Sequence, residues 1–192
     1  MIEPRNFNFN SAMLAISADA FATHYRSHYL KYVNNVNKLI PTYWDHFTIK
    51  QILNNCAIDS NLHNQAAQVW NHEFFFEQFT GNNQKPSTLL IKLIQDSGYE
   101  HFLDFCQDII DAGKSIFGSG YVWVVQRFGT LRIITTQNAQ NFIHHEYNNP
   151  ILTIDMWEHS HYIDYFNDKE NYIRNVLNTI DWSFIETRLC KK

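Results

Sequence analysis

The stretch ILTIDMWEHSHYIDY, residues 151–165, passes from strand-like to helix-like composition within a few residues. Its first five residues are mostly β-branched or apolar, which is typical of a short buried strand that Asp155 closes. His159 follows Asp155 by four residues, and Glu158 is suited to the first turn of a helix, where an acid meets the positive helix end. The stretch therefore predicts a strand-to-helix junction that carries a carboxylate and an imidazole.

The second half of the chain predicts helices beside a small antiparallel sheet. Two further runs, residues 121–125 and 131–136, have strand composition, and residues 127–130 form the turn between them. Helical spacing covers residues 88–96, 99–111, 168–179 and 182–189. Together with the strand that ends at Asp155, this half is expected to contain a three-stranded antiparallel sheet.

The first half predicts a helical hairpin. A long helix is expected from about residue 21 to residue 40, with Ser17 as its N-cap and Pro41 as its stop. A second helix is expected over residues 62–79, after a short-helix region over residues 47–53. Loop-forming residues are densest over residues 81–87, so we predict two domains, 1–81 and 82–192, in an α+β protein.

Composition restricts the function classes. With 45% apolar and 16% aromatic residues, the 192-residue chain has ample material for a core and is not expected to be disordered. Its net charge of −4 makes nucleic acid an improbable partner. No apolar run approaches the roughly 20 residues needed to span a membrane. The three cysteines are widely spaced and form no disulfide framework, so a soluble, cytoplasmic protein is expected.

Polar groups that can bind a metal recur at intervals of four residues, so each set shares one side of a helix or junction. An isolated pair of this kind is more typical of a surface or a satisfied core. Several of these groups lie among aromatic residues, however, and an unpaired buried polar group costs roughly 1 to 3 kcal/mol, which a shared metal would avoid. The groups are His24, His28 and Tyr32, then Gln68 and His72, and finally Asp155 and His159.

Four segments, in their order and spacing, resemble the iron/manganese superoxide dismutase family. They are HYRSHYLKYVNNVN (24–37), AAQVWNH (66–72), FGSG (117–120) and DMWEHSHYIDY (155–165). The resemblance covers nearly the whole chain. It implies a helical hairpin followed by an α/β domain with a three-stranded antiparallel sheet, with a redox metal between the two. The implied enzyme is a superoxide dismutase, and the implied substrate is superoxide.

The resemblance also assigns the metal site. It implies His24, His72, Asp155 and His159 as ligands, with a solvent molecule as the fifth. Gln68 matches the glutamine that hydrogen-bonds this solvent in the iron-type branch. In the manganese-type branch the equivalent glutamine lies in the later sheet region, where Ala139 occupies the matching position and Gln137 is close by. We therefore expect one iron per chain, with manganese or either metal as the alternative.

Further roles follow from the same resemblance. Tyr32 and His28 would form the entrance gate and relay protons, whereas without the resemblance a packed aromatic and a core histidine are the simpler interpretation. Glu158 and Tyr162 would reach the partner subunit's site histidines across a twofold interface, so a homodimer is expected. Glu158 could instead serve only as a first-turn acid.

The chain departs from the family in several residues that wall the site. The resemblance also does not identify the basic residue that guides the substrate. Tyr121 stands where tryptophan is usual, Tyr29 where a second histidine is frequent, and Phe75 and Phe76 where Tyr or Trp often occur. An acidic protein that takes an anionic substrate requires locally positive surroundings at the metal, for which Arg188 is the better candidate and Arg26 the weaker.

Two rival functions remain open from the residues alone. Three histidines and an aspartate with water would also suit zinc, which predicts a colourless hydrolase without redox activity. The scaffold could also belong to a metal-binding protein that has lost turnover.

Overall fold

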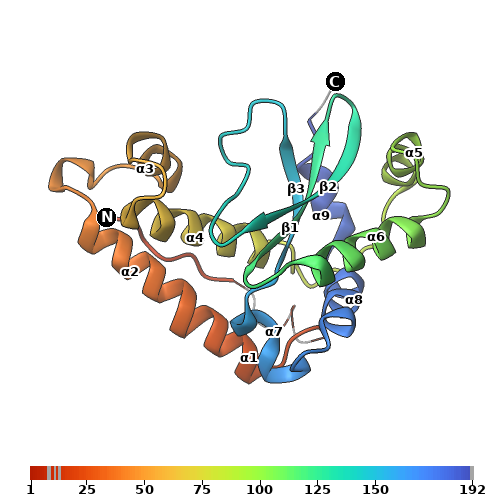
Figure 1. The fold of residues 1–192 in the computed structure, drawn as a ribbon, viewed down its shortest axis with the longest axis horizontal. Helices are drawn as coiled ribbons and strands as arrows, with labels where there is room; N and C mark the ends of the chain where they lie inside the picture. Colours follow the sequence, from red (N-terminus) through yellow and green to blue (C-terminus); the bar gives the residue numbers. More distant parts are fainter. Residues whose placement is uncertain (8–9, 11, 13, 191–192) are drawn as a thin grey trace.

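The computed structural model describes residues 1–7, 10, 12 and 14–190, and it has the predicted α+β architecture (Figure 1). Among the described residues, no helix is both long enough and apolar enough to cross a lipid bilayer. The elements in order are α1 (Ala18–Ala22), the π-helix η2 (Thr23–Tyr29), α2 (Leu30–Leu39), the 3-10 helix η3 (Thr42–Trp44), α3 (Ile49–Asn55), α4 (Asn61–Phe76), α5 (Thr88–Asp96), α6 (Phe102–Ser115), β1 (Gly120–Arg127), β2 (Thr130–Gln137), β3 (Asn149–Asp155), α7 (Glu158–Tyr165), α8 (Lys169–Thr179) and α9 (Trp182–Thr187).

The first half forms the predicted hairpin. Elements α1, η2 and α2 follow one another as a single long helix, which begins after Ser17 and ends at Ile40. The hydroxyl of Ser17 accepts a hydrogen bond from the Ala20 N–H, as expected of an N-cap. This helix packs against α4, and the N-terminal segment runs along the pair, where Ile2 exchanges hydrogen bonds with the side chain of Asn37 (Figure 1).

The prediction of an uninterrupted α-helix is wrong over η2. The N–H of Leu30 bonds to the carbonyl of Tyr25, five residues back instead of four, so the π-helical turn holds one extra residue. Residues four apart therefore have different angular positions around the helix axis from those they would have in an α-helix. His24 and Tyr29 become fully buried, while His28 stays half-buried. Hydrogen bonds between residues five apart depend on tertiary packing, and the spacing of residues in the sequence does not reveal that packing.

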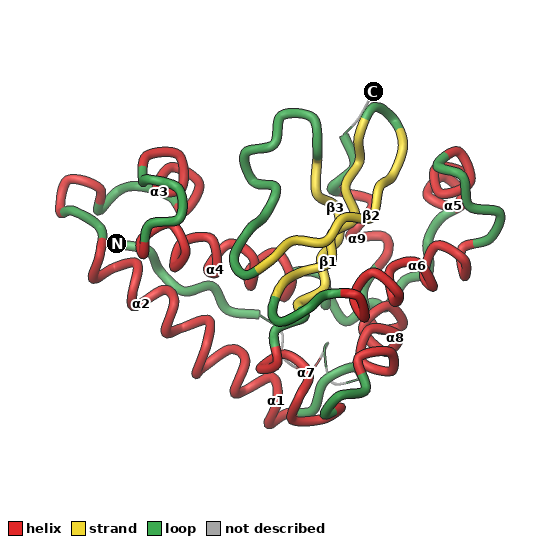
Figure 2. The backbone as a smooth tube through the Cα atoms, viewed as in Figure 1, coloured by secondary structure: helices red, strands yellow, loops and turns green. Residues whose placement is uncertain are grey.

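The second half contains the predicted three-stranded antiparallel sheet, in the order β2-β1-β3. The β1–β2 turn lies at Phe128 and Gly129, whose φ angles of 47° and 80° are both positive, as a tight two-residue hairpin turn requires. Helices flank the sheet in Figure 2. Helix α6 starts later than the predicted residue 99, because a capping box between His101 and Asp104 fixes its beginning.

The FGSG segment places the start of β1 against β2. A Cβ atom on Gly120 would lie 2.1 Å from the backbone oxygen of Thr136, so only glycine permits this approach. The next residue, Tyr121, pairs with Asp155 of β3 across the sheet. The close contact at Gly120 therefore sets the start of β1 against β2, while the separate pairing of β1 with β3 brings Tyr121 beside Asp155.

The two halves share one hydrophobic core and are joined by buried hydrogen bonds. The side chain of Gln78, just after α4, bonds to both the N–H and the carbonyl of Thr153 in β3, each at 2.8 Å. This contact holds the end of α4 beside the strand that ends at Asp155. The division into domains 1–81 and 82–192 stays a prediction.

Candidate metal centre

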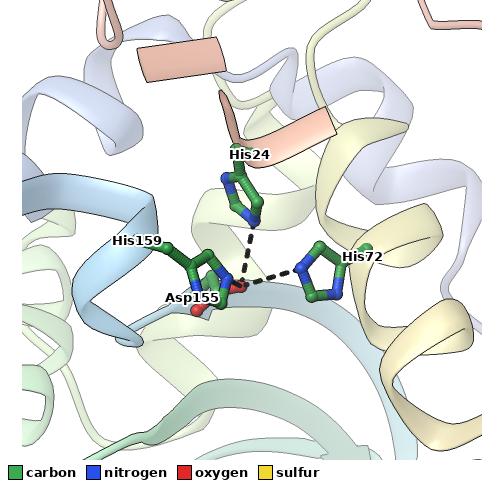
Figure 3. Close-up of side chains that lie close together, drawn as sticks. All are labelled: His24, His72, Asp155 and His159. Carbon is green, nitrogen blue, oxygen red and sulfur yellow. Dashed lines mark ion pairs between the residues drawn. The ribbon is translucent and has the colours of Figure 1, made fainter. Parts of the chain in front are cut away.

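Four side chains from four elements converge between the two halves (Figure 3). His24 comes from η2, His72 from α4, Asp155 from the end of β3 and His159 from α7. One ligand atom of each lies within 4.8 Å of the corresponding atoms of the others. The structure therefore brings together all four residues that the family resemblance implied.

Asp155 is the centre of the cluster. Its Oδ2 lies 3.3 Å from Nε2 of His24, 3.7 Å from Nε2 of His159 and 3.9 Å from Nε2 of His72. Its other oxygen, Oδ1, accepts a hydrogen bond of 2.8 Å from the N–H of Trp157, and this bond holds the carboxylate in place. Asp155 thus satisfies a backbone donor before α7 with one oxygen and presents the other to the imidazoles.

The environment keeps these groups in the protonation states that metal ligands need. Burial lowers the pKa values of His24 and His72, so both imidazoles are neutral at pH 7. Nδ1 of His72 lies 2.7 Å from the carbonyl oxygen of Gln68, which can only accept; Nδ1 therefore carries the proton and Nε2 keeps its lone pair. Burial opposes ionisation of Asp155, but the imidazoles of His159 and His24 hold its pKa well below the usual range.

The cluster fits a metal ion. Nε2 of His24, His72 and His159 and Oδ2 of Asp155 are buried, and within the described ranges none of these atoms has a hydrogen-bond partner. Each unsatisfied buried group of this kind costs about 1 to 3 kcal/mol, and one cation would satisfy all four. Three imidazole nitrogens and one carboxylate oxygen suit iron, manganese or zinc.

Gln68 lies beside the cluster on α4, one helical turn before His72. Its side-chain Oε1 accepts a hydrogen bond of 2.7 Å from the hydroxyl of Tyr121, and its Nε2 is buried with no partner among the described residues. Ala139 occupies the position that matches the glutamine of the manganese-type branch, and the side chain of the nearby Gln137 is exposed. Of the two glutamines, Gln68 and Gln137, only Gln68 is therefore buried.

A cavity of about 390 Å³ opens beside the ligands. Tyr32 and Gln68 lie in its wall, and the Tyr32 ring is 5.2 Å from that of His72. Burial, together with the charge of Asp155, raises the pKa of Tyr32 to about 12, so its phenol stays protonated at neutral pH. The remaining lining residues are Asp59, His63, Asn64, Gln65, Gln137, Asn138, Ala139, Gln140 and Trp157.

The family models agree with this architecture. The model for the alpha-hairpin domain of iron/manganese superoxide dismutases matches residues 6–80, and the model for the C-terminal domain of the same family matches residues 86–188. The chain belongs to the iron/manganese superoxide dismutase family. This membership makes the protein a superoxide dismutase, an oxidoreductase, and confirms both the family and the fold class expected from the sequence.

Individual relatives match over nearly the full chain. The protein named superoxide dismutase [Fe] from Legionella pneumophila is 36% identical over 177 residues, covering 91% of this chain and 90% of that protein. The one from Leptolyngbya boryana is 34% identical over 180 residues, covering 91% and 89%. The one from Entamoeba histolytica is 32% identical over 184 residues and covers 95% of both chains.

The positive lining expected of this superoxide dismutase is not found in the described part of the cavity, whose lining residues include neither Lys nor Arg. Arg188 is instead held by Glu77 at 2.9 Å and lies over the ring of Phe74, 3.6 Å from its centroid. Arg26 is exposed on η2 and lines a different hollow beside Phe21 and Tyr25. Neither arginine lines this cavity, and a guiding role for Arg188 or Arg26 stays a prediction.

His28, the other predicted gate residue, stacks on His159 of the cluster. Its ring lies 3.9 Å from that of His159, at an angle of 17°. Burial, together with the neighbouring imidazoles of His159 and His24, lowers the pKa of His28 to about 4. His28 is therefore neutral at physiological pH and packs against the ligand cluster, and it does not line the cavity described above.

Three tyrosines support the site in ways that the sequence did not indicate. Tyr121 donates to Gln68, and the hydroxyl of Tyr172 donates to the backbone oxygen of Asp155 at 2.9 Å. Tyr29 donates to Glu73 and accepts from the N–H of Arg5, both at 2.8 Å, so it ties the N-terminal segment to the hairpin. Strand register would have placed Tyr121 beside Asp155, but spacing alone carries no signal for these partners.

Proposed function

We propose that this enzyme converts superoxide to dioxygen and hydrogen peroxide with one iron per chain, held by His24, His72, Asp155 and His159. The observation that supports this assignment best is the convergence of three imidazole nitrogens and one carboxylate oxygen, all buried and unpaired within the described residues. Iron is supported by the relatives, which are named superoxide dismutase [Fe], and by the position of Gln68 beside the cluster.

A bound iron supplies the electron transfer, since it can accept an electron from one superoxide and give one to the next. The residues of the chain set the conditions for both halves of this cycle. Asp155 contributes the single carboxylate among the three imidazoles, which limits the charge that must be buried. Ligand oxygen and nitrogen atoms, unlike thiolates, also resist oxidation by the peroxide product.

Gln68 and Tyr32 would handle protons and hydrogen bonds next to the metal. Nε2 of Gln68 is a donor without a partner in the described structure, so it can donate to a group bound at the metal and thereby shift the reduction potential. The phenol of Tyr32, which is protonated at neutral pH, lies in the wall of the cavity and can donate to an anionic substrate or to the peroxide that leaves. His28 would support this gate by packing on His159.

The metal assignment is tested by reloading the purified protein with iron, manganese or zinc in separate samples. We expect the iron-loaded protein to consume superoxide at least about tenfold faster than the manganese-loaded protein, because the donor of Gln68 tunes the potential for one metal and not the other. The zinc-loaded protein should be inactive. Stoichiometric iron without consumption of superoxide would contradict the proposal, and hydrolysis by the zinc form alone would support the rival hydrolase.

We also propose that the enzyme works as a homodimer in the cytoplasm. Its cysteines Cys56, Cys106 and Cys190 are all free thiols, which suits a reducing compartment. Large apolar side chains are also exposed on helix α7, which carries His159, and just after it: Tyr162 is 48% and Ile163 47% exposed, and Phe166, the C-cap residue, is 64% exposed. Exposed apolar side chains of this kind are typical of a surface that a second chain covers. Glu158 and Tyr162 would then contact the partner's His159 and the partner's His28.

Replacing Ile163 by glutamate is expected to separate the dimer. A charge in the middle of an apolar interface should weaken association by about 2 kcal/mol or more, because the carboxylate would be buried without a partner. Sedimentation velocity should show the wild type at twice the mass of the chain and Ile163→Glu at the mass of a single chain. Leu103→Glu, which changes an exposed leucine on α6, should remain a dimer. A wild-type protein that sediments as a single chain would refute the proposal.

A further inference from the structure

Tyr121 connects the strand region of Asp155 with the carboxamide of Gln68. It is the second residue of β1, it pairs with Asp155 of β3 across the sheet, and its side chain is fully buried. Its hydroxyl donates to Oε1 of Gln68 on α4 at 2.7 Å. A single buried phenol therefore links the sheet of the second half to the hairpin of the first, next to the ligand cluster.

The hydrogen bond from Tyr121 fixes the orientation of the Gln68 side-chain amide. A carboxamide has two ends of similar size, of which the oxygen accepts hydrogen bonds and the nitrogen donates them. Because the O–H of Tyr121 holds Oε1, Nε2 must lie at the opposite end, where it is buried and has no partner among the described residues. Turning the amide over would replace this donor with an acceptor.

The phenol is a dependable donor. The side chain of Tyr121 is fully buried, and its hydroxyl lies 2.7 Å from Oε1 of Gln68, an amide oxygen that can only accept, so the phenol is the donor of this bond. Other rings, such as that of Trp123 at 5.8 Å, surround it and restrict its movement. The donor and its acceptor are both fixed by packing, which preorganises the amide before any ligand is bound.

We propose that Tyr121 is a positioning residue of this enzyme, whose O–H orients the Gln68 carboxamide so that Nε2 faces the metal and sets its reduction potential. This inference rests on the proposed function, because it assumes a redox metal at the cluster. In this role Tyr121 acts through Gln68 and is not itself a metal ligand. Without this hydroxyl, the Gln68 amide can adopt either of two orientations, and only one of them directs the N–H donor toward the metal.

A double-mutant cycle on the iron-loaded enzyme tests this role. The four proteins are the wild type, Tyr121→Phe, Gln68→Ala and the double variant, and each is measured by spectroelectrochemical titration and by superoxide consumption. Tyr121→Phe removes one oxygen and keeps the ring, and circular dichroism verifies the fold. We expect it to shift the reduction potential in the same direction as Gln68→Ala and to lower turnover about tenfold, while iron content is unchanged.

The decisive comparison is the double variant. If Tyr121 acts through Gln68, the double variant should have the potential of Gln68→Ala alone, because the two changes remove the same interaction. Additive shifts, or no shift in Tyr121→Phe, would overturn the inference. Tyr172→Phe removes another fully buried phenol oxygen, one that bonds to the backbone of Asp155. A shift of equal size in that control would also overturn the inference.

The same experiment separates this inference from the proposed function. If Gln68→Ala shifts the potential and Tyr121→Phe does not, the role of Tyr121 is wrong and the function stands. If the wild-type protein binds iron but shows no reversible reduction, the proposed function itself fails.

Discussion

Asp155→Asn should remove the metal and reduce superoxide dismutation by at least about 100-fold. Loss of a residue that only supports a ligand typically costs about 10- to 100-fold, and Asp155 is the sole negative group among the four side chains. Asparagine has nearly the same shape, and its carbonyl oxygen can still accept from the N–H of Trp157, as Oδ1 of Asp155 does. The fold should therefore persist, and the loss can be attributed to the missing charge.

Elemental analysis of the purified variant, together with a superoxide assay, measures this effect. Asp181→Asn is a matched control, since Asp181 is also buried but caps α9 through Ser183 and lies outside the cluster. It should lose stability and keep its iron. If Asp155→Asn retained both iron and turnover, the assignment of Asp155 as a ligand would be incorrect.

Gln68→Leu should reduce turnover about 100-fold while the iron content stays close to that of the wild type. Leucine fills a similar volume, so the cavity wall is kept, but the N–H donor of Nε2 is lost. The effect should appear as a lower kcat and a shifted reduction potential, because the donor acts on the metal and not on substrate entry.

Gln68→Glu gives the sharper control for this prediction. Glutamate keeps an oxygen that can accept from Tyr121, yet it has no N–H donor for the metal side. If the donor is what matters, Gln68→Glu and Gln68→Leu should lose turnover to a similar degree. Wild-type turnover in the glutamate variant would show that an N–H donor is not required at this position.

Local sequence patterns predicted most of the elements. The N-cap at Ser17, the turn around Gly129 and the strand that ends at Asp155 all follow from residue types with strong local preferences, and each lies where it was expected. The π-helix η2 could not be predicted, because its longer hydrogen bonds are stabilised by packing against distant elements. The start of α6 differed because a histidine, rather than a usual capping residue, begins it.

The sequence predicted the four side chains that the structure brings together, but it did not predict the contacts around them. The family resemblance identified His24 and its three companions because their spacing is specific. The contacts of Arg188 with Glu77 and with the ring of Phe74 were not predicted. The contact of Tyr121 with Gln68 crosses between the halves of the chain. Long-range pairings of this kind depend on the tertiary fold, and no local pattern encodes them.

The spread of the four ligands along the chain also determines when the metal can be acquired during synthesis. His24 and His72 leave the ribosome first, and the hairpin that carries them can form at that stage. Asp155 and His159 emerge much later, after most of the chain has been translated. Two imidazoles without the carboxylate make a weak and poorly selective pair. All four side chains are therefore available together only near the end of translation, so a metal that all four hold can be bound no earlier.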